Sequence, residues 1–364
     1  MKKIIKRLDI TIPALCAAVF MLFGCTNTLA EDSYVQPTDW SEGVMATDAW
    51  VMAGVGISQT VYSDALHLAY SEDGLTWTAL NSNARVFTPT IGSGHIRDPY
   101  IFRQNDGTFV LLAADYTEDG QYYDMGSLYE LTYGDNPSNC IYVAFSDDLI
   151  TWKNEHLLQV TNGEGTDGDE RHAWTPRAIY NKSDLCYDIY WTGDDSDGVN
   201  HVYVTQTYDF ISVHDLDSHI IYSPGYSVTG AGIVKANSKY YLFARDADID
   251  YATGEGGDIQ AAVLDTWGDG AFSLLSGTYC NRGDDQDTPV YVENPCVYEL
   301  EDGVTWIMIA QESNYAGTYQ TLSTTDISSS GSWEEITTLT LPETVCASVT
   351  RITADELEAL EAAY

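Results

Sequence analysis

One short pattern recurs five times along this chain of 364 residues. Each copy begins with a segment in which aromatic and apolar residues alternate, and continues with a segment in which Ser or Thr precedes Asp and, in most copies, an aromatic residue. The alternating segments are residues 49–52, 108–112, 187–191, 240–243 and 305–309. A period of two residues is typical of strands, and the Ser/Thr/Asp segments supply turns between them. The pattern therefore predicts an all-β fold made of repeated sheets.

The spacing of the copies leaves room for about four short strands in each repeat. We expect a five-bladed β-propeller, in which radial repetition buries the faces of each blade against its neighbours. A two-sheet sandwich followed by a second domain is the competing architecture, and the even spacing across residues 48–340 favours the propeller. Only residues 354–363 have a helical pattern. We therefore expect residues 46–364 to form one propeller domain, with functional residues contributed by several inner strands at one mouth.

The first residues have the pattern of an export signal. A basic start is followed by an apolar stretch, residues 10–23, which is too short to span a membrane comfortably. It ends at Cys25 in a sequence that resembles a bacterial lipobox, although Phe23 is bulkier than that pattern prefers and a plain secretory signal is the alternative. We predict a lipoprotein signal peptide at 1–24, lipidation of Cys25 and a polar tether at 25–45. The mature protein is then expected on the extracellular face of a bacterial cell envelope.

Charge excludes several classes of partner. The chain has 16 Lys and Arg against 55 Asp and Glu, a formal net charge of −39. Such a field repels phosphate backbones and anionic membrane surfaces, so we expect no nucleic acid and no membrane contact except the lipid anchor. The 26 Tyr and 9 Trp residues make neutral carbohydrate the natural partner, although solubility alone also explains the charge. We expect a monomer that binds polysaccharide or oligosaccharide.

Cysteine and acidic residues give weak signals for disulfides and metals. Of seven Cys, five lie beyond the predicted tether, and this odd, widely spaced set does not form a disulfide framework. Buried free thiols are the favoured interpretation, and a single Cys280–Cys296 bridge is the alternative. No zinc spacing occurs, so no cofactor is predicted. The Asp-rich segments 194–198 and 246–250 offer oxygen ligands to a cation, but solvated acidic turns are favoured.

Two carboxylates stand out from the acidic loops. Hydrolysis of a glycosidic bond needs two carboxyl groups, one protonated and one ionised. Asp98 lies between Arg97 and Pro99, where the guanidinium favours the ionised form and the proline fixes the backbone. Glu293 lies at the corresponding place in a later repeat, where an apolar mouth would favour its protonated form. The simpler interpretation is that both are strand-end carboxylates.

Four segments together resemble glycoside hydrolase family 43. Residues 81–109 are similar to the family's first-blade signature, and 173–180 to its Trp-Ala-Pro-Glu motif. Residues 232–243 are similar to the following blade, and 292–298 to the Glu-Gly-Pro segment that carries the family's general acid. The resemblance runs from about residue 48 to 351. It implies a five-bladed propeller and an inverting mechanism on arabinofuranosyl or xylosyl linkages.

The resemblance also implies roles for individual residues. Asp98 would be the general base and Glu293 the general acid. Candidates for contact with the sugar are Arg97, Tyr100, Trp174, Arg177, Asp246 and Tyr319. For the three aromatic residues among them, packing in the blade core is an equally good interpretation.

Three departures from the family pattern affect the expected activity. Gly230 stands at the position where the family has a third carboxylate, which adjusts the pKa of the general acid. Arg177 replaces the Glu of the Trp-Ala-Pro-Glu motif, and Cys346 replaces a His near the last strand. Asp246 or Asp248 is a candidate substitute for the third carboxylate, although an Asp-rich loop is the favoured interpretation. Two hypotheses follow: a surface-anchored inverting glycosidase, or a non-catalytic carbohydrate-binding propeller that kept the sugar pocket.

Overall fold

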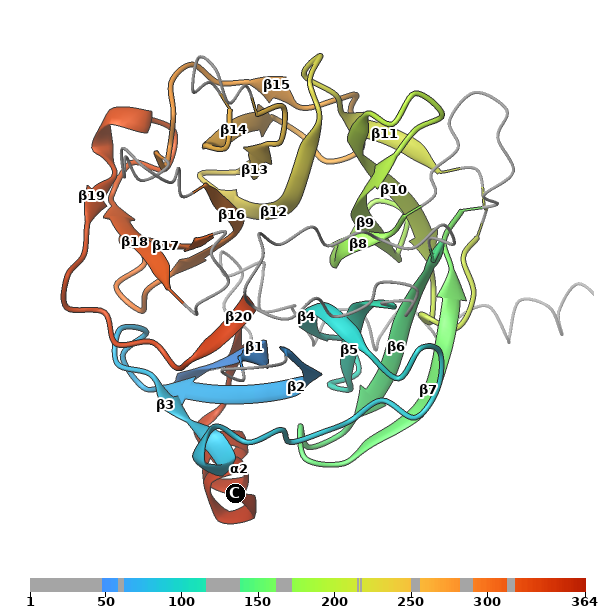
Figure 1. Cartoon of the computed structure of the whole chain (residues 1–364), viewed down its shortest axis with the longest axis vertical. Helices are drawn as coiled ribbons and strands as arrows, with labels where there is room; N and C mark the ends of the chain where they lie inside the picture. Colours follow the sequence, from blue (N-terminus) through green and yellow to red (C-terminus); the bar gives the residue numbers. More distant parts are fainter. Residues whose placement is uncertain are drawn as a thin grey trace, which may run out of the picture.

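The structure, a computed structural model, describes residues 48–57, 62–115, 138–161, 172–214, 216, 218–249, 256–281, 291–312 and 318–364. These residues form five four-stranded antiparallel sheets arranged as a ring (Figure 1). The predicted five-bladed β-propeller is confirmed. The predicted signal peptide, Cys25 and the tether lie outside the described residues. None of the helices in the described part is long and apolar enough to cross a membrane.

Each blade runs from an inner strand at the axis to an outer strand, which is short in every blade except blade 2, and we number the blades along the chain. Blade 1 contains β20 (Thr344–Ile352), β1 (Ala49–Ile57), β2 (Tyr62–Ser71) and β3 (Thr78–Ala79). Blade 2 contains β4 (Ile96–Arg103), β5 (Phe109–Asp115), β6 (Cys140–Ser146) and β7 (Trp152–Gln159). Blade 3 contains β8 (Trp174–Asn181), β9 (Cys186–Asp194), β10 (Asn200–Thr207) and β11 (His219–Tyr222).

The last two blades repeat this arrangement. Blade 4 contains β12 (Val228–Ala236), β13 (Lys239–Asp246), β14 (Ile259–Leu264) and β15 (Ser273–Leu274). Blade 5 contains β16 (Val292–Glu299), β17 (Trp306–Glu312), β18 (Tyr319–Thr324) and β19 (Glu334–Glu335). The alternating segments found in the sequence lie in the second strand of each blade. The inner strands β20, β4, β8, β12 and β16 surround the axis (Figure 1).

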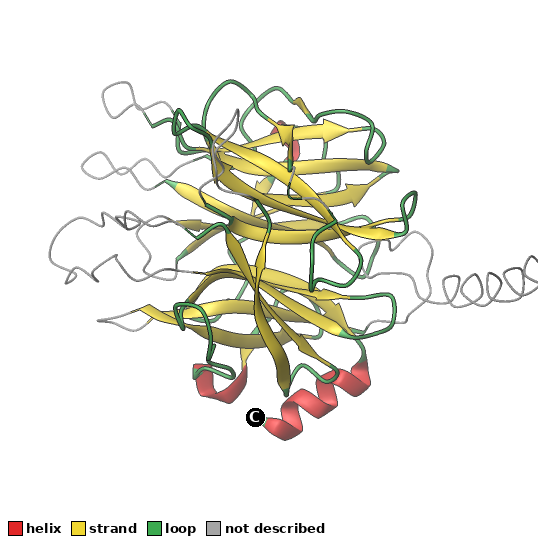
Figure 2. Ribbon diagram, turned by 90° about the vertical axis from the view of Figure 1, so that its right-hand side faces the viewer, coloured by secondary structure: helices red, strands yellow, loops and turns green. Residues whose placement is uncertain are grey.

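The two ends of the propeller meet in one sheet. The C-terminal strand β20 pairs with β1 from Ala49↔Ile352 to Gly56↔Thr344, so hydrogen bonds close the ring. The predicted helix follows as α2 (Ala354–Ala363), and Thr353 and Glu356 form a capping box at its start. Its residues Leu357 and Leu360 pack into the hydrophobic core of blades 1 and 2. The helix itself lies at the edge of the molecule (Figure 2).

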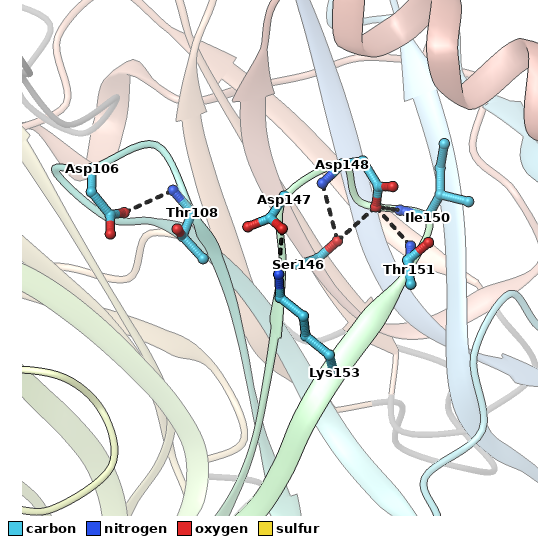
Figure 3. A network of polar contacts seen from close by, with 8 residues as sticks. All are labelled: Asp106, Thr108, Ser146, Asp147, Asp148, Ile150, Thr151 and Lys153. Carbon is cyan, nitrogen blue, oxygen red and sulfur yellow. Dashed lines mark hydrogen bonds and ion pairs between the residues drawn. The ribbon is translucent and has the colours of Figure 1, made fainter.

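The repeated Ser/Thr–Asp segments are turns after the third strand of a blade. In blade 2, Ser146 Oγ donates to Asp148 Oδ1 at 3.0 Å, and the same oxygen accepts the N–H groups of Ile150 at 2.9 Å and Thr151 at 2.7 Å (Figure 3). Burial raises the pKa of Asp148, but these hydrogen bonds outweigh it and the net shift is downward. Asp73 holds the equivalent turn in blade 1. Some of the acidic residues of the chain therefore stabilise turns of the fold.

Apolar residues fill the spaces between neighbouring blades. Phe102 of blade 2 packs with Trp191 and Phe210 of blade 3, and all three are almost fully buried. The cysteines of the described residues are free, and Cys140 alone among them is more than slightly exposed. The prediction of buried free thiols is confirmed for the others, and Cys280 and Cys296 form no bridge.

Candidate active site

Every inner strand carries a bulge at the same level of the ring. The register shifts between Arg97 and Tyr100, and at the equivalent places of the other four inner strands. One residue of each bulge has a positive φ: Asp98 (50°), Thr175 (50°), Gly230 (69°), Asn294 (47°) and Cys346 (58°). We call these five residues the axial layer. Positive φ is uncommon outside glycine, and bulges often lie beside active sites, where they redirect side chains.

Hydrogen bonds connect the side chains of the axial layer. Asp98 Oδ2 accepts from the backbone N–H of Thr175 at 3.3 Å and from its hydroxyl at 3.1 Å. Asp98 Oδ1 accepts from Asn294 Nδ2 at 3.1 Å, and the same amide nitrogen lies 3.8 Å from Cys346 Sγ. Burial, followed by the charge of Asp98, raises the pKa of the Cys346 thiol. Groups from blades 1, 2, 3 and 5 thus meet around one carboxylate.

Glu293 reaches this level from a different backbone position. The expectation that it occupies the same place as Asp98 is wrong, because the residue equivalent to Asp98 in β16 is Asn294 and Glu293 corresponds to Arg97. Glu293 is only 7% exposed. Its charge nevertheless acts on the Cys346 thiol, as the charge of Asp98 does, so Glu293 lies close to the axial layer.

Two polar side chains on neighbouring strands hold Glu293. Arg245 Nη1 donates to Glu293 Oε2 at 2.6 Å, and Gln311 Nε2 donates to Oε1 at 3.3 Å. Gln311 Oε1 in turn accepts the backbone N–H of Cys346 at 2.6 Å. Both carboxylate oxygens of Glu293 are therefore engaged, one by a charge-assisted hydrogen bond from a half-buried guanidinium.

The position of the missing third carboxylate is filled by another side chain. A Cβ added at Gly230 would lie 2.5 Å from Asn294 Oδ1 and 2.8 Å from Asn294 N. The Glu-Gly-Pro segment of the family has glycine where this chain has Asn294. The chain therefore combines a glycine at 230 with a side chain at 294, and an Asp at 230 does not fit beside it.

Two of the predicted sugar contacts, Tyr100 and Arg177, lie on the inner strands β4 and β8, each two residues after the positive-φ residue of its strand. Arg177 is 8% exposed, and its Cζ lies 5.4 Å from the centre of the Tyr100 ring. At the level of the layer, Arg97 is buried and its charge acts on the Cys346 thiol. Trp174 stacks on His172 with ring centres 4.1 Å apart.

The remaining two candidates, Asp246 and Tyr319, form their nearest polar contacts with residues other than Asp98. Burial, opposed by a backbone hydrogen bond and reinforced by Asp248 and Asp258, raises the pKa of Asp246, which faces Tyr222. The Tyr319 hydroxyl donates to the Thr344 carbonyl at 2.6 Å. Within the described ranges, no three His, Cys, Asp or Glu side chains are grouped as metal ligands.

Sequence reasoning missed Thr175, Asn294, Arg245 and Gln311. The first two carried a visible signal, because Pro176 and Pro295 follow them as Pro99 follows Asp98.

Comparisons with known proteins agree on the architecture. A family model described as "Probable glycosyl hydrolase domain", related to glycoside hydrolase family 43, matches residues 48–358. No curated protein matches the chain by sequence.

Solved structures are similar at low identity. The family 43 protein BlXynB from Bacillus licheniformis is 13% identical, with 85% of this chain and 56% of that chain covered and a TM-score of 0.55. A xylan β-1,4-xylosidase from Bacillus halodurans C-125 is 14% identical, with 84% and 51% covered and a TM-score of 0.51. A mutant α-L-arabinanase from Cellvibrio cellulosa is 16% identical, with 76% and 88% covered and a TM-score of 0.51. The chain spans about half the length of the first two, and these similarities show the fold.

Proposed function

Because the chain belongs to this glycosyl hydrolase family related to family 43, we propose that it is an inverting glycosidase for arabinofuranosyl or xylosyl linkages in plant-type polysaccharide or oligosaccharide. The observation that carries the proposal is a pair of carboxylates at one level of the ring: Asp98 belongs to the axial layer, and Gln311 connects Glu293 to the backbone N–H of Cys346 in the same layer. An inverting reaction uses one such group on each side of the scissile bond.

Asp98 is suited to the role of base. A carboxylate offers about four acceptor positions, and Thr175 and Asn294 occupy three of those of Asp98. The weakly donating thiol of Cys346 is the remaining neighbour, and a water molecule can displace it. These contacts fix the carboxylate so that it accepts a proton from that water while the water oxygen bonds to the anomeric carbon.

Glu293 would donate a proton to the leaving oxygen as the glycosidic bond breaks, which leaves a carboxylate behind. Its Oε2 already accepts from Arg245 and its Oε1 from Gln311, so neither oxygen is free to hold a proton aimed at the substrate. We therefore infer a weak general acid. Substrates whose leaving group needs little protonation should be cleaved much faster than alkyl glycosides.

A non-catalytic carbohydrate-binding propeller is the second candidate. It is favoured by the Arg245–Glu293 ion pair and by the replacement of a third carboxylate by Gly230 and Asn294. In that case Asp98 would serve only to hold the axial layer and the sugar.

One set of assays separates the two candidates. The purified protein is tested with p-nitrophenyl arabinofuranoside and xyloside and with arabinan and arabinoxylan. We expect hydrolysis that falls by about 10²–10⁴-fold in Asp98→Asn, while sugar binding persists. Asp106→Asn, the same change in an exposed turn, should leave the rate unchanged. No cleavage by the wild type, together with oligosaccharide binding that Asp98→Ala alters, would favour the binding protein.

We also propose that the protein is exported and anchored to the bacterial envelope through Cys25. The basic start, the short apolar stretch and the lipobox-like sequence support this location. Tethering would place a monomeric propeller where polysaccharide is accessible.

A further inference from the structure

A hollow lies at the mouth of the propeller opposite the axial layer, and we call it the distal hollow. Its volume is about 770 Å³, and its wall comes from blades 3, 4 and 5, which are neighbours in the ring (Figure 1). The axial layer lies near the start of the inner strands, whereas the distal hollow adjoins their far ends. In β8, for example, Thr175 of the layer and Asn181 of the wall are six residues apart, or about 20 Å. A ligand bound in the distal hollow is therefore remote from Asp98.

Aromatic rings and short polar side chains line the distal hollow. Tyr180, Tyr240 and Trp267 belong to its wall, and each is partly exposed. Asn237 and Ser238 form the turn between β12 and β13, and both are exposed. Aromatic rings offer flat apolar faces, whereas amides and hydroxyls both donate and accept hydrogen bonds. This combination, in a volume within the range of about 300–1,000 Å³ that is typical of small-molecule sites, suits a ligand with C–H faces and hydroxyl groups.

The wall of the distal hollow has balanced charge, although the chain is strongly acidic. In the whole sequence, Asp and Glu outnumber Lys and Arg by 55 to 16. In the wall, Lys182 and Lys235 equal Asp265 and Glu299 in number. Lys239, on the neighbouring strand β13, pairs with Asp265 at 2.7 Å. The distal hollow therefore lacks the excess of one charge that attracts a cation or an anion, and a neutral ligand fits it best.

Contacts between blades hold the aromatic side of the wall in place. Trp267 follows β14 in blade 4, and its Nε1 donates to Asp188 Oδ2 on β9 of blade 3. Asn181 Nδ2 donates to the same oxygen at 2.8 Å, and Asp188 is only 4% exposed. The ring centres of Trp267 and Tyr240 are 5.2 Å apart, and Lys235 Nζ lies 5.8 Å from the centre of the Tyr240 ring. A wall arranged in advance loses little conformational entropy when a ligand binds.

We propose that the distal hollow binds a neutral oligosaccharide segment of a polysaccharide, as a carbohydrate site additional to that of Asp98. Trp267 and Tyr240 pack against the C–H faces of the sugar rings, and Asn237 and Ser238 exchange hydrogen bonds with the sugar hydroxyls. The choice of carbohydrate as the ligand rests on the proposed function, whereas the hollow and its charge balance do not. Occupation of this site keeps the polysaccharide on the protein whether or not a bond is cleaved at Asp98.

Affinity electrophoresis of the full protein, in native gels that contain arabinan, arabinoxylan or anionic polygalacturonate, tests the proposal. Every protein in this test carries Asp98→Asn, which prevents cleavage of the polysaccharide in the gel. In the two neutral gels, Trp267→Ala should raise the dissociation constant by about tenfold or more, as expected for the loss of a central aromatic contact. Tyr208→Ala removes an aromatic residue that is 60% exposed and lies outside the wall, and it should leave retention unchanged.

Val304→Arg provides a second variant in case Trp267→Ala, which loses the bond to Asp188, does not fold. Val304 belongs to the wall and is 56% exposed, so a long side chain there occupies the hollow without opening the core and should weaken retention in the same way. Retention that neither folded variant changes, no retention in either neutral gel, or retention in polygalacturonate alone would overturn the proposal. Hydrolysis of p-nitrophenyl glycosides by the wild type is measured separately. If hydrolysis is absent while the variants weaken retention, the glycosidase proposal fails and the distal site stands.

Discussion

Replacement of Gly230 by Asp tests the packing of the axial layer directly. A Cβ at this position meets Asn294 Oδ1 at 2.5 Å and Asn294 N at 2.8 Å, so the neighbouring strand must shift. The left-handed backbone, φ 69°, adds a conformational cost of about 1–2 kcal/mol for a residue with a Cβ. Overpacking adds about 1–3 kcal/mol. We expect Gly230→Asp to lower the free energy of unfolding by about 2–5 kcal/mol as the sum of these two terms.

Gly303 provides a matched control. Its φ is 68°, but a Cβ there would meet nothing within 4 Å. Gly303→Asp should therefore show the backbone cost alone. Urea unfolding of both variants at neutral pH measures the difference, which is the steric contribution of Asn294. Equal losses of stability in the two variants would refute the packing argument.

The double variant Gly230→Asp/Asn294→Gly restores the combination expected from the family. Removal of the Asn294 side chain eliminates the contact at Oδ1. A glycine at 294 also adopts the positive φ of this position, 47°, without the steric cost of a Cβ. We expect the two changes to be coupled, so that the double variant is more stable than the sum of the single effects by about 0.5–3 kcal/mol. If the site is catalytic, the restored carboxylate should also raise kcat on poor leaving groups. Coupling in stability without a gain in kcat would support the packing and contradict the catalytic role.

Three further predictions address the acid, the turns and the anchor. Glu293→Gln should slow the cleavage of alkyl glycosides much more than that of p-nitrophenyl glycosides, and equal losses would exclude Glu293 as the acid. The pKa of Asp148 is lowered in the folded state, so its contribution to stability is present above the unfolded value of about 3.9 and is lost as pH falls through the folded value. The stability difference between wild type and Asp148→Asn, measured by urea unfolding from pH 7 to 3, should therefore shrink on acidification, and a constant difference would contradict this. Cys25→Ser should move the protein from the membrane fraction to the soluble fraction, whereas unchanged membrane association would exclude lipidation.

Features of the fold that depend on residues close together in the sequence were predictable from it. Alternating segments such as 187–191 became second strands, and the Ser146–Asp148 segment became a turn held by its own backbone N–H groups. The helix at 354–363 begins where Thr353 and Glu356 cap it. The ring followed from repetition, because five similar sheets bury their faces only against one another.

The site was predicted less completely because its geometry depends on bulges and on contacts between blades. Proline after Asp98, Thr175 and Asn294 marks three of the bulges, but the equivalent residues Gly230 and Cys346 are followed by alanine. No sequence pattern around Arg245 or Glu293 indicates that these two side chains, from blades 4 and 5, form an ion pair.

The bulge in β16 changes the interpretation of the substitutions near Asp98. Strict alternation would place Glu293 and Asn294 on opposite faces of the strand, but the extra residue brings both toward the axis. A carboxylate at 294 would face Asp98 at hydrogen-bond distance and repel it, whereas the Asn294 amide donates to it at 3.1 Å. The same amide side chain occupies the space that Gly230 leaves open. The changes at 230 and 294 therefore form one concerted change that places an amide donor beside Asp98 and orients its carboxylate.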